Sequence, residues 1–124
     1  MKLSNNVNLT DLAGLYISEI FASQDGKAIT ELDLSGNEKM ESKTAQFIGE
    51  ALLANPNYKI ERLKFKGVKL EETGLYRLLE AVNANKNITR LHVGIVSDFG
   101  LRTMAELLPL NKTCLLYTSP SPRD

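Results

Sequence analysis

An apolar triplet with fixed spacing recurs three times along this chain and limits what the chain can fold into. It reads Ile29-x-x-Leu32-x-Leu34, then Ile60-x-x-Leu63-x-Phe65, then Ile88-x-x-Leu91-x-Val93. The alternation in Leu32-x-Leu34 is typical of a strand with one buried face. Gly36-Asn37 is turn chemistry that ends the first of these strands. Ile60 follows Ile29 by 31 residues and Ile88 follows Ile60 by 28, so the sequence predicts a repeat protein.

A helix is predicted after each of these strands and also before the first one. The first helix starts near Asn8 or Thr10 and ends near Ser23. The second starts at Ser42 or Thr44 and ends at Asn55. The first of these helices carries apolar residues at helical spacing: Leu12, Ala13, Tyr16, Ile17, Ile20 and Phe21. The third has the strongest helical pattern, Leu75, Leu78, Leu79 and Val82, and the fourth starts at Ser97-Asp98 and ends at Pro109.

A strand-turn-helix unit of this length cannot bury its own apolar face and has to stack on its neighbours. We therefore expect an α/β fold, a solenoid with parallel strands on a concave inner face and helices on a convex outer face. The predicted repeat domain spans residues 1–113, with a partial copy at 1–28 and copies at 29–59, 60–87 and 88–113. Leu3 and Asn6 precede Leu34 and Asn37 by the same 31 residues, which places the end of an earlier copy at the start of the chain.

The segment Ile29-x-x-Leu32-x-Leu34-x-x-Asn37 resembles the leucine-rich repeat signature. The unit length and the helical pattern Leu70-x-x-x-Gly74-Leu75-x-x-Leu78-Leu79 are similar to the ribonuclease-inhibitor-like subclass. The resemblance implies a horseshoe segment in which Asn37 hydrogen-bonds the backbone of a neighbouring loop. The next two copies have Val68 and Val96 in its place, so the loop groups there need other partners. Ribonuclease inhibitors are rich in cysteine and residues 1–113 contain none, so their ribonuclease binding is not carried over.

Residues 114–124 do not follow the repeat pattern. They resemble the conceptual translation of a transposase adaptor used in sequencing libraries, which implies that the natural reading frame ended near Thr113. The alternative is a natural disordered tail, because its Ser/Pro run cannot continue a strand or a helix. The repeat spacing places the start of the next strand near Cys114, where this change of sequence occurs. We expect a non-native or disordered segment and leave it out of the functional argument.

Composition excludes several classes of function. Lys and Arg total 15 and so do Asp and Glu, so the net charge predicts no attraction to nucleic acid or to a membrane. No apolar run approaches the length of about 18 residues that a membrane helix needs. The N-terminus lacks the apolar core of a signal peptide, and the one cysteine is Cys114. These features favour a cytoplasmic protein.

The candidate binding residues are those that alternate with the buried ones along each strand. If Leu32 and Leu34 are buried, their polar neighbours project from the concave face. Matching positions in adjacent strands then form two rows, Glu31–Arg62–Arg90 and Asp33–Lys64–His92, with Lys66 beyond them. Five cationic or potentially cationic groups on two strands favour docking of an acidic patch on another protein. A solvated face whose charges pair laterally would carry the same residues, and the sequence leaves both open.

No catalytic or metal-binding constellation is present in the sequence. His92 is the only histidine, and without Cys or clustered carboxylates it does not form a zinc site. A catalytic base needs an oriented partner, and the nearest candidate, Asp33, is two strands away. We interpret His92 as a surface residue and expect no enzyme activity, metal or cofactor.

The function expected from these observations is a protein-binding scaffold that uses the concave face of a leucine-rich repeat array. Two alternatives rest on the family resemblance alone: a GTPase-activating repeat protein, or the sensing end of an innate-immune-type receptor. Neither end of the array has an evident polar cap, so we also expect marginal stability or self-association through the end units.

Overall fold

In a computed structural model, the chain forms a mixed α/β fold with a four-stranded parallel sheet. The structure describes residues 1–6, 8–23, 29–55, 57–95, 98–107 and 114–118. Helices and strands alternate, and each strand pairs with the strand before it, in the order β1-β2-β3-β4. The elements are α1 (Asp11–Ala22), β1 (Glu31–Asp33), α2 (Ser42–Ala54), β2 (Arg62–Phe65), α3 (Glu71–Ala84), β3 (Arg90–Ile95), α4 (Asp98–Leu107) and β4 (Cys114–Thr118).

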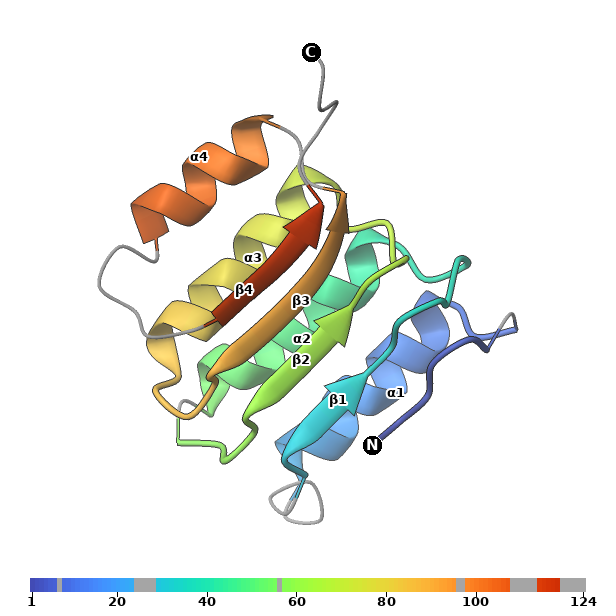
Figure 1. The fold of residues 1–124 in the computed structure, drawn as a ribbon. Helices are drawn as coiled ribbons and strands as arrows, with labels where there is room; N and C mark the ends of the chain where they lie inside the picture. The colour runs from blue at the N-terminus through green and yellow to red at the C-terminus, as the bar shows by residue number, and fades with distance from the viewer. Residues whose placement is uncertain (7, 24–28, 56, 96–97, 108–113, 119–124) are drawn as a thin grey trace.

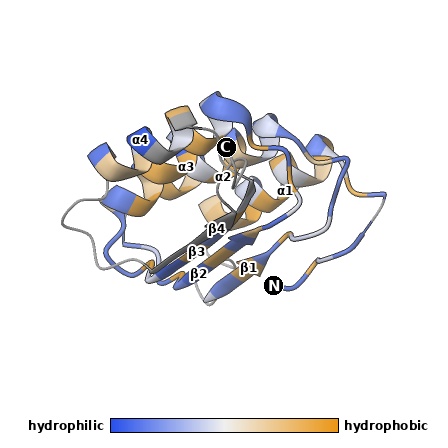
Figure 2. Ribbon diagram, turned by 45° about the horizontal axis from the view of Figure 1, so that its top comes forward, coloured by the Kyte–Doolittle hydropathy of each residue, from blue (hydrophilic) through white to orange (hydrophobic). Residues whose placement is uncertain are grey.

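Two layers make up the molecule. Figures 1 and 2 show the helices together on one face of the sheet, and the other face without a helical cover. Neighbouring helices pack side by side, α1 on α2, α2 on α3 and α3 on α4. This arrangement follows from the units themselves, because each has one apolar strand face and one apolar helix stripe to bury.

The core lies between the layers and contains the recurring triplets. Leu32, Leu63 and Leu91 are fully buried at equivalent positions of β1, β2 and β3. Ile60 and Ile88 are also buried, although β2 and β3 begin two residues after them. The first Ile of these two triplets therefore packs inward from the loop that precedes the strand. The largest fully buried side chains are Phe21, Phe65, Leu32, Leu34, Met40, Ile48, Leu52, Ile60, Leu63, Leu78, Leu79 and Ile88.

The capping signal is confirmed at α1, whereas α2 begins at Ser42 itself, after Glu41, whose side chain makes no capping hydrogen bond. Thr10 caps α1, and its Oγ1 accepts a hydrogen bond from the backbone N–H of Leu12 at 3.4 Å. Asp11 caps the next helix from outside, since its Oδ1 accepts from the N–H of Glu41 at 2.8 Å and from the Thr44 hydroxyl at 2.6 Å. Ser97, expected at the start of α4, lies outside the described residues.

Only part of the apolar surface of α1 is buried. Of the six expected residues, Ile17 and Phe21 are buried, and Phe21 packs edge-on against Tyr58 with ring centroids 5.3 Å apart. Leu12, Tyr16 and Ile20 are exposed, although they share the helical spacing of the buried residues. They lie on the side of α1 that has no neighbouring helix.

Asn37 behaves as the resemblance implied. It is fully buried, and its side-chain amide donates to the carbonyls of Leu3 at 2.9 Å and Leu34 at 2.7 Å. Its Oδ1 accepts from the N–H of Asn6 at 3.0 Å. The Val68 side chain has no polar group and cannot form these hydrogen bonds. The loop that contains Val68 is closed instead by its backbone N–H, which donates to the carbonyl of Phe65 at 3.1 Å. Val96 lies outside the described residues.

The C-terminal segment differs from a disordered tail over five residues. Cys114–Thr118 forms β4, parallel to β3, at the place where the next strand was expected. The outer edge of β3 offers unpaired backbone groups, and backbone pairing tolerates any sequence that can adopt an extended conformation. Residues 119–124 lie outside the described residues.

Candidate functional site

The register of the sheet brings the predicted polar residues into two rows. Glu31 pairs with Arg62, and Arg62 pairs with Arg90. Asp33 pairs in the same way with Lys64, and Lys64 with His92. Matching Cα atoms in adjacent strands lie about 4.8 Å apart, so the side chains of a row are neighbours.

These side chains lie on the face of the sheet that no helix covers. Along β2, half-buried Arg62 and Lys64 alternate with fully buried Leu63 and Phe65. We call this surface the open sheet face. It consists of Glu31, Asp33, Arg62, Lys64, Lys66, Arg90 and His92.

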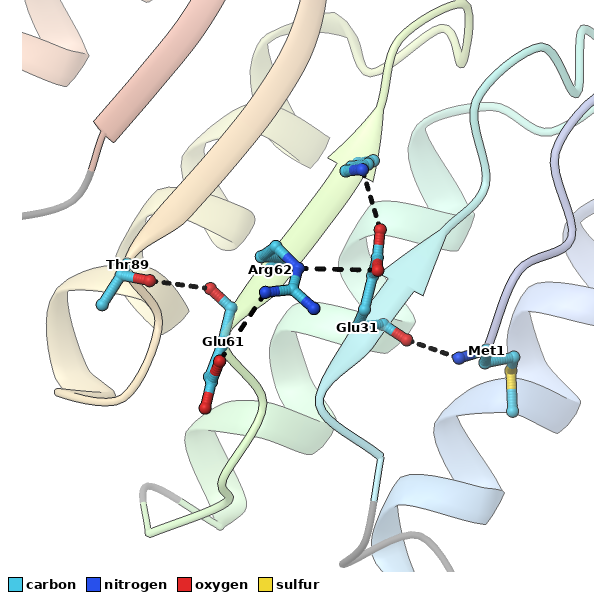
Figure 3. A network of polar contacts seen from close by, with 6 residues as sticks. Met1, Glu31, Glu61, Arg62 and Thr89 are labelled. Atoms are coloured by element: carbon cyan, nitrogen blue, oxygen red, sulfur yellow. Dashed lines mark hydrogen bonds and ion pairs between the residues drawn. The ribbon is translucent and has the colours of Figure 1, made fainter.

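Glu31 is the centre of an ion-pair network on the open sheet face. Its carboxylate lies 2.8 Å from the Nζ of Lys64 and 3.5 Å from the Nε of Arg62, and Figure 3 shows Arg62 reaching toward it. The Glu31 side chain is only 12% exposed. The Lys64 ammonium, at hydrogen-bonding distance, holds the pKa of the Glu31 carboxyl below its ordinary value, and Arg62 acts in the same direction against the effect of burial. Charge on this edge of the face is therefore largely compensated.

Hydrogen bonds from neighbouring segments hold the backbone carbonyls of Glu31 and Glu61. The amino group of Met1 donates to the carbonyl of Glu31 at 2.7 Å, and the Thr89 hydroxyl lies 3.5 Å from the carbonyl of Glu61 (Figure 3). Arg62 also lies 3.7 Å from the Glu61 carboxylate. Arg62 is thus placed between two acidic groups.

The carboxylate of Asp33, the second acidic residue of the face, forms a hydrogen bond with the backbone two residues further along the chain. Its Oδ1 accepts a hydrogen bond from the N–H of Ser35 at 3.0 Å. Lys66 and Arg90 are exposed, and neither belongs to an ion pair within the part of the chain that the structure describes. The uncompensated positive charge of the face is therefore at Lys66 and Arg90.

His92 lies beside this uncompensated charge. Partial burial lowers the pKa of the His92 imidazole, and the ammonium groups of Lys66 and Lys64 lower it further, while Asp33 acts weakly in the opposite direction. These effects favour the neutral form of the imidazole. No Asp33–His92 hydrogen bond is found among the described residues, which leaves His92 without the partner that a catalytic base would need.

Two further lysines, Lys2 and Lys69, lie near the open sheet face and were not predicted from the strand pattern. The backbone of Lys2, in the N-terminal segment, forms a parallel β-bridge with that of Asp33. The Lys2 ammonium also helps to lower the pKa of Glu31. The 31-residue offset from Lys2 to Asp33 is the signal in the sequence that would have located it. Lys69 lines a shallow open depression of about 640 Å³ where β2 and β3 end, together with Lys66, Gly67 and Gly94.

Gly67 allows the turn after β2 to approach the turn after β1, because a Cβ on Gly67 would lie 3.1 Å from the backbone nitrogen of Gly36, whereas Gly94 in β3 leaves room for a Cβ at ordinary contact distance. Gly67 has a φ of +90°, which favours glycine. A Cβ on Gly94 would lie 3.4 Å from the backbone nitrogen of Gly67. The depression is also lined by Val68, Leu70 and Glu71, so an acidic side chain lies beside its two lysines.

Other kinds of site find no support in the described residues. Within them, no three His, Cys, Asp or Glu side chains are grouped so that they could hold a metal ion. None of the helices in the same ranges is long and apolar enough to cross a membrane. No protein-family model matches the chain, and none of the curated proteins matches it either.

Proposed function

We propose that this chain is a segment of a leucine-rich-repeat solenoid of the ribonuclease-inhibitor-like type, and that its open sheet face binds an acidic surface of another protein. The observation that carries the proposal is the register of β1, β2 and β3. It gathers cations from residues far apart in sequence onto the one face of the sheet that the helices leave free.

The distribution of charge supports an acidic partner. The open sheet face with adjacent Lys2 carries five lysines and arginines and two acidic residues, although the whole chain has 15 of each sign. The helices carry the compensating charge: α1 contains Asp11 and Glu19 and no cation, and α3 contains three Glu and one Arg. Separation of charge between two faces favours one orientation when a charged partner approaches.

Arg90 and Lys66 are the residues that we expect to bind the partner most strongly. Arginine holds a carboxylate with two parallel hydrogen bonds, and Arg90 has no ion pair of its own among the described residues. Arg62 and Lys64 contact Glu31, so a partner's carboxylate gains less there because it competes with an existing ion pair. A few anchors of this kind carry most of the binding energy of an interface.

The proposal is tested with a glutamate-rich peptide and a glutamine-rich peptide of equal length as probes. Binding to the full chain is followed by NMR chemical-shift changes at low salt. We expect the acidic peptide to shift signals on β2 and β3, and the double variant Lys66→Ala/Arg90→Ala to bind at least about tenfold more weakly, which is 1.4 kcal/mol.

The matched control is Lys43→Ala/Arg102→Ala. It removes the same charge from exposed positions on α2 and α4. If both double variants lose the same affinity, or if shifts are confined to the helices, the open sheet face is a solvated surface and the proposal is wrong.

A further inference from the structure

The helix layer contains an open hollow of about 340 Å³ that is lined by residues of α2, α3 and α4. Two aromatic rings border it, Tyr76 of α3 and Phe99 of α4, and their exposed fractions are 45% and 49%. We call this surface the aromatic hollow. The remaining residues that line it are Gln46, Glu72, Thr73 and Arg77. Figure 1 shows α3 between α2 and α4, so the hollow lies between neighbouring helices and not on an uncovered end of the layer.

Phe99 stands where the preceding helix has a polar residue. Thr73 and Phe99 each come directly before a glycine near the start of their helix, Gly74 in α3 and Gly100 in α4. The Thr73 hydroxyl lies 3.0 Å from the hydroxyl of Ser42, at the start of α2. A phenylalanine has no group that could continue this row of hydroxyls. Packing does not account for the ring either, since half of its surface is exposed.

The two rings of the aromatic hollow are not in contact with each other. Among the described residues, the ring–ring contact is that of Phe21 with Tyr58, inside the core. Tyr76 and Phe99 therefore border a common space without closing it. The face of an aromatic ring attracts a cation, and the planar guanidinium of arginine stacks on such a face. The space between the rings is suited to this group.

The charges beside the rings also favour a cation. Glu72 lines the aromatic hollow, is exposed, and belongs to no ion pair within the described ranges. Arg77 is the cation that lines the hollow, and its guanidinium lies 3.1 Å from the Glu80 carboxylate, which offsets its charge. The carboxylate of Glu72 is thus the charge in the hollow that has no counterion.

The aromatic hollow continues into a second depression of about 320 Å³ at the starts of α2 and α3, because both are lined by Gln46 and Thr73. The charged residues of this second depression are Asp11, Glu41, Lys43 and Glu71. Three acidic groups there oppose one lysine. A chain segment that leaves the rings and follows the starts of the helices therefore meets a negative surface, which is complementary to basic side chains.

We propose that the aromatic hollow binds an arginine side chain in a basic segment of a partner protein. The guanidinium lies between Tyr76 and Phe99, and the Glu72 carboxylate accepts hydrogen bonds from it. Neighbouring basic residues of the same segment lie along the second depression. This site is on the helix layer and does not depend on the acidic partner proposed for the open sheet face, so partners of opposite charge occupy opposite faces of the sheet–helix sandwich.

NMR titration of the full chain at low salt tests the proposal, with a tetra-arginine peptide with blocked ends as the probe. Its control is the tetracitrulline peptide, since citrulline keeps a planar head group of similar shape without the charge. We expect tetra-arginine to shift signals of Tyr76, Phe99 and Glu72, and the ring currents to move the arginine side-chain methylene signals upfield. Tetracitrulline should do neither. Equal binding of tetracitrulline, or shifts confined to other parts of the chain, overturns the proposal.

Variants separate recognition by the rings from general attraction of charge. Tyr76→Ala and Phe99→Ala should each weaken binding of tetra-arginine about two- to fivefold, because each removes one exposed cation–π contact. Tyr76→Phe keeps the ring and should bind as the natural sequence does. Tyr16→Ala is the matched control, since it removes another exposed tyrosine from a helix outside the hollow. Equal losses for Tyr16→Ala and Tyr76→Ala contradict the proposal.

A tetralysine peptide tests whether the site selects the guanidinium. Lysine carries the same charge but has no planar group to stack, so we expect tetralysine to bind more weakly and without the upfield shift of its methylene signals. Glu72→Gln should weaken binding of both peptides, because the carboxylate attracts either cation. Equal binding of tetralysine and tetra-arginine, or unchanged binding in Glu72→Gln, overturns the assignment of the hollow to arginine.

Discussion

At the scale of single residues, Glu31 determines which cations on the open sheet face remain available. Its carboxylate contacts Lys64 and Arg62, and both contacts depend on the pairing of β1 with β2. Lys66 and Arg90 lie beyond its reach and stay exposed to solvent. The affinity of the face for an anion is therefore expected to depend more on Lys66 and Arg90 than on the residues nearest its centre.

His92 reports this electrostatic environment directly. Its pKa is lowered by partial burial and by Lys66 and Lys64, so the folded state binds fewer protons than the unfolded state near pH 6.5. We therefore expect its NMR titration midpoint to lie below 6.5 in the free chain. An acidic ligand on the face should raise this midpoint, and binding should strengthen as the pH falls through it.

The assignment is unambiguous because the chain has one histidine. Lys66→Ala should move the midpoint back toward the ordinary value, whereas Lys43→Ala on α2 should not. A midpoint at or above 6.5 in the free chain would show that the lysines do not act on His92 as described.

At the scale of elements, the strand is the part that the sequence predicted best. Alternation fixes which residues of a strand share a face, so Leu32, Leu63 and Leu91 were identifiable as interior. The helical spacing of α1 located its apolar residues but did not show which of them are buried. Periodicity identifies an apolar surface, but burial depends on a neighbouring element, and Leu12, Tyr16 and Ile20 have none.

Leu63 tests the interior of the sheet. It is fully buried in β2, between β1 and β3, and Leu63→Ala should lower the free energy of unfolding by about 2–5 kcal/mol because a cavity remains. Leu12→Ala is the matched control, since the same change at an exposed position should cost under about 0.5 kcal/mol at concentrations where the chain is monomeric. Urea unfolding measures both, and equal losses would contradict the assignment of Leu63 to the core.

At the scale of the whole molecule, the chain has no net charge, but stacking of similar units gathers cations on the open sheet face and leaves acidic residues on the helices. The rows on the open sheet face were predictable from equal spacing along the sequence. The ion pairs were not, because side-chain geometry brings Glu31 into contact with Arg62 in its own row and also with Lys64 in the other row. Lys2 was missed because its place on the face depends on the pairing of the N-terminal segment with β1.

The parallel, in-register ladder of β1, β2 and β3 underlies the binding face and the buried triplets. Cross-strand nuclear Overhauser effects in the isotopically labelled chain test it most directly. We predict contacts between the backbone protons of Leu32 and Leu63 and between those of Leu63 and Leu91, in the parallel pattern. Close Hα–Hα contacts of antiparallel pairs among these strands, or no contact between them, would contradict the account.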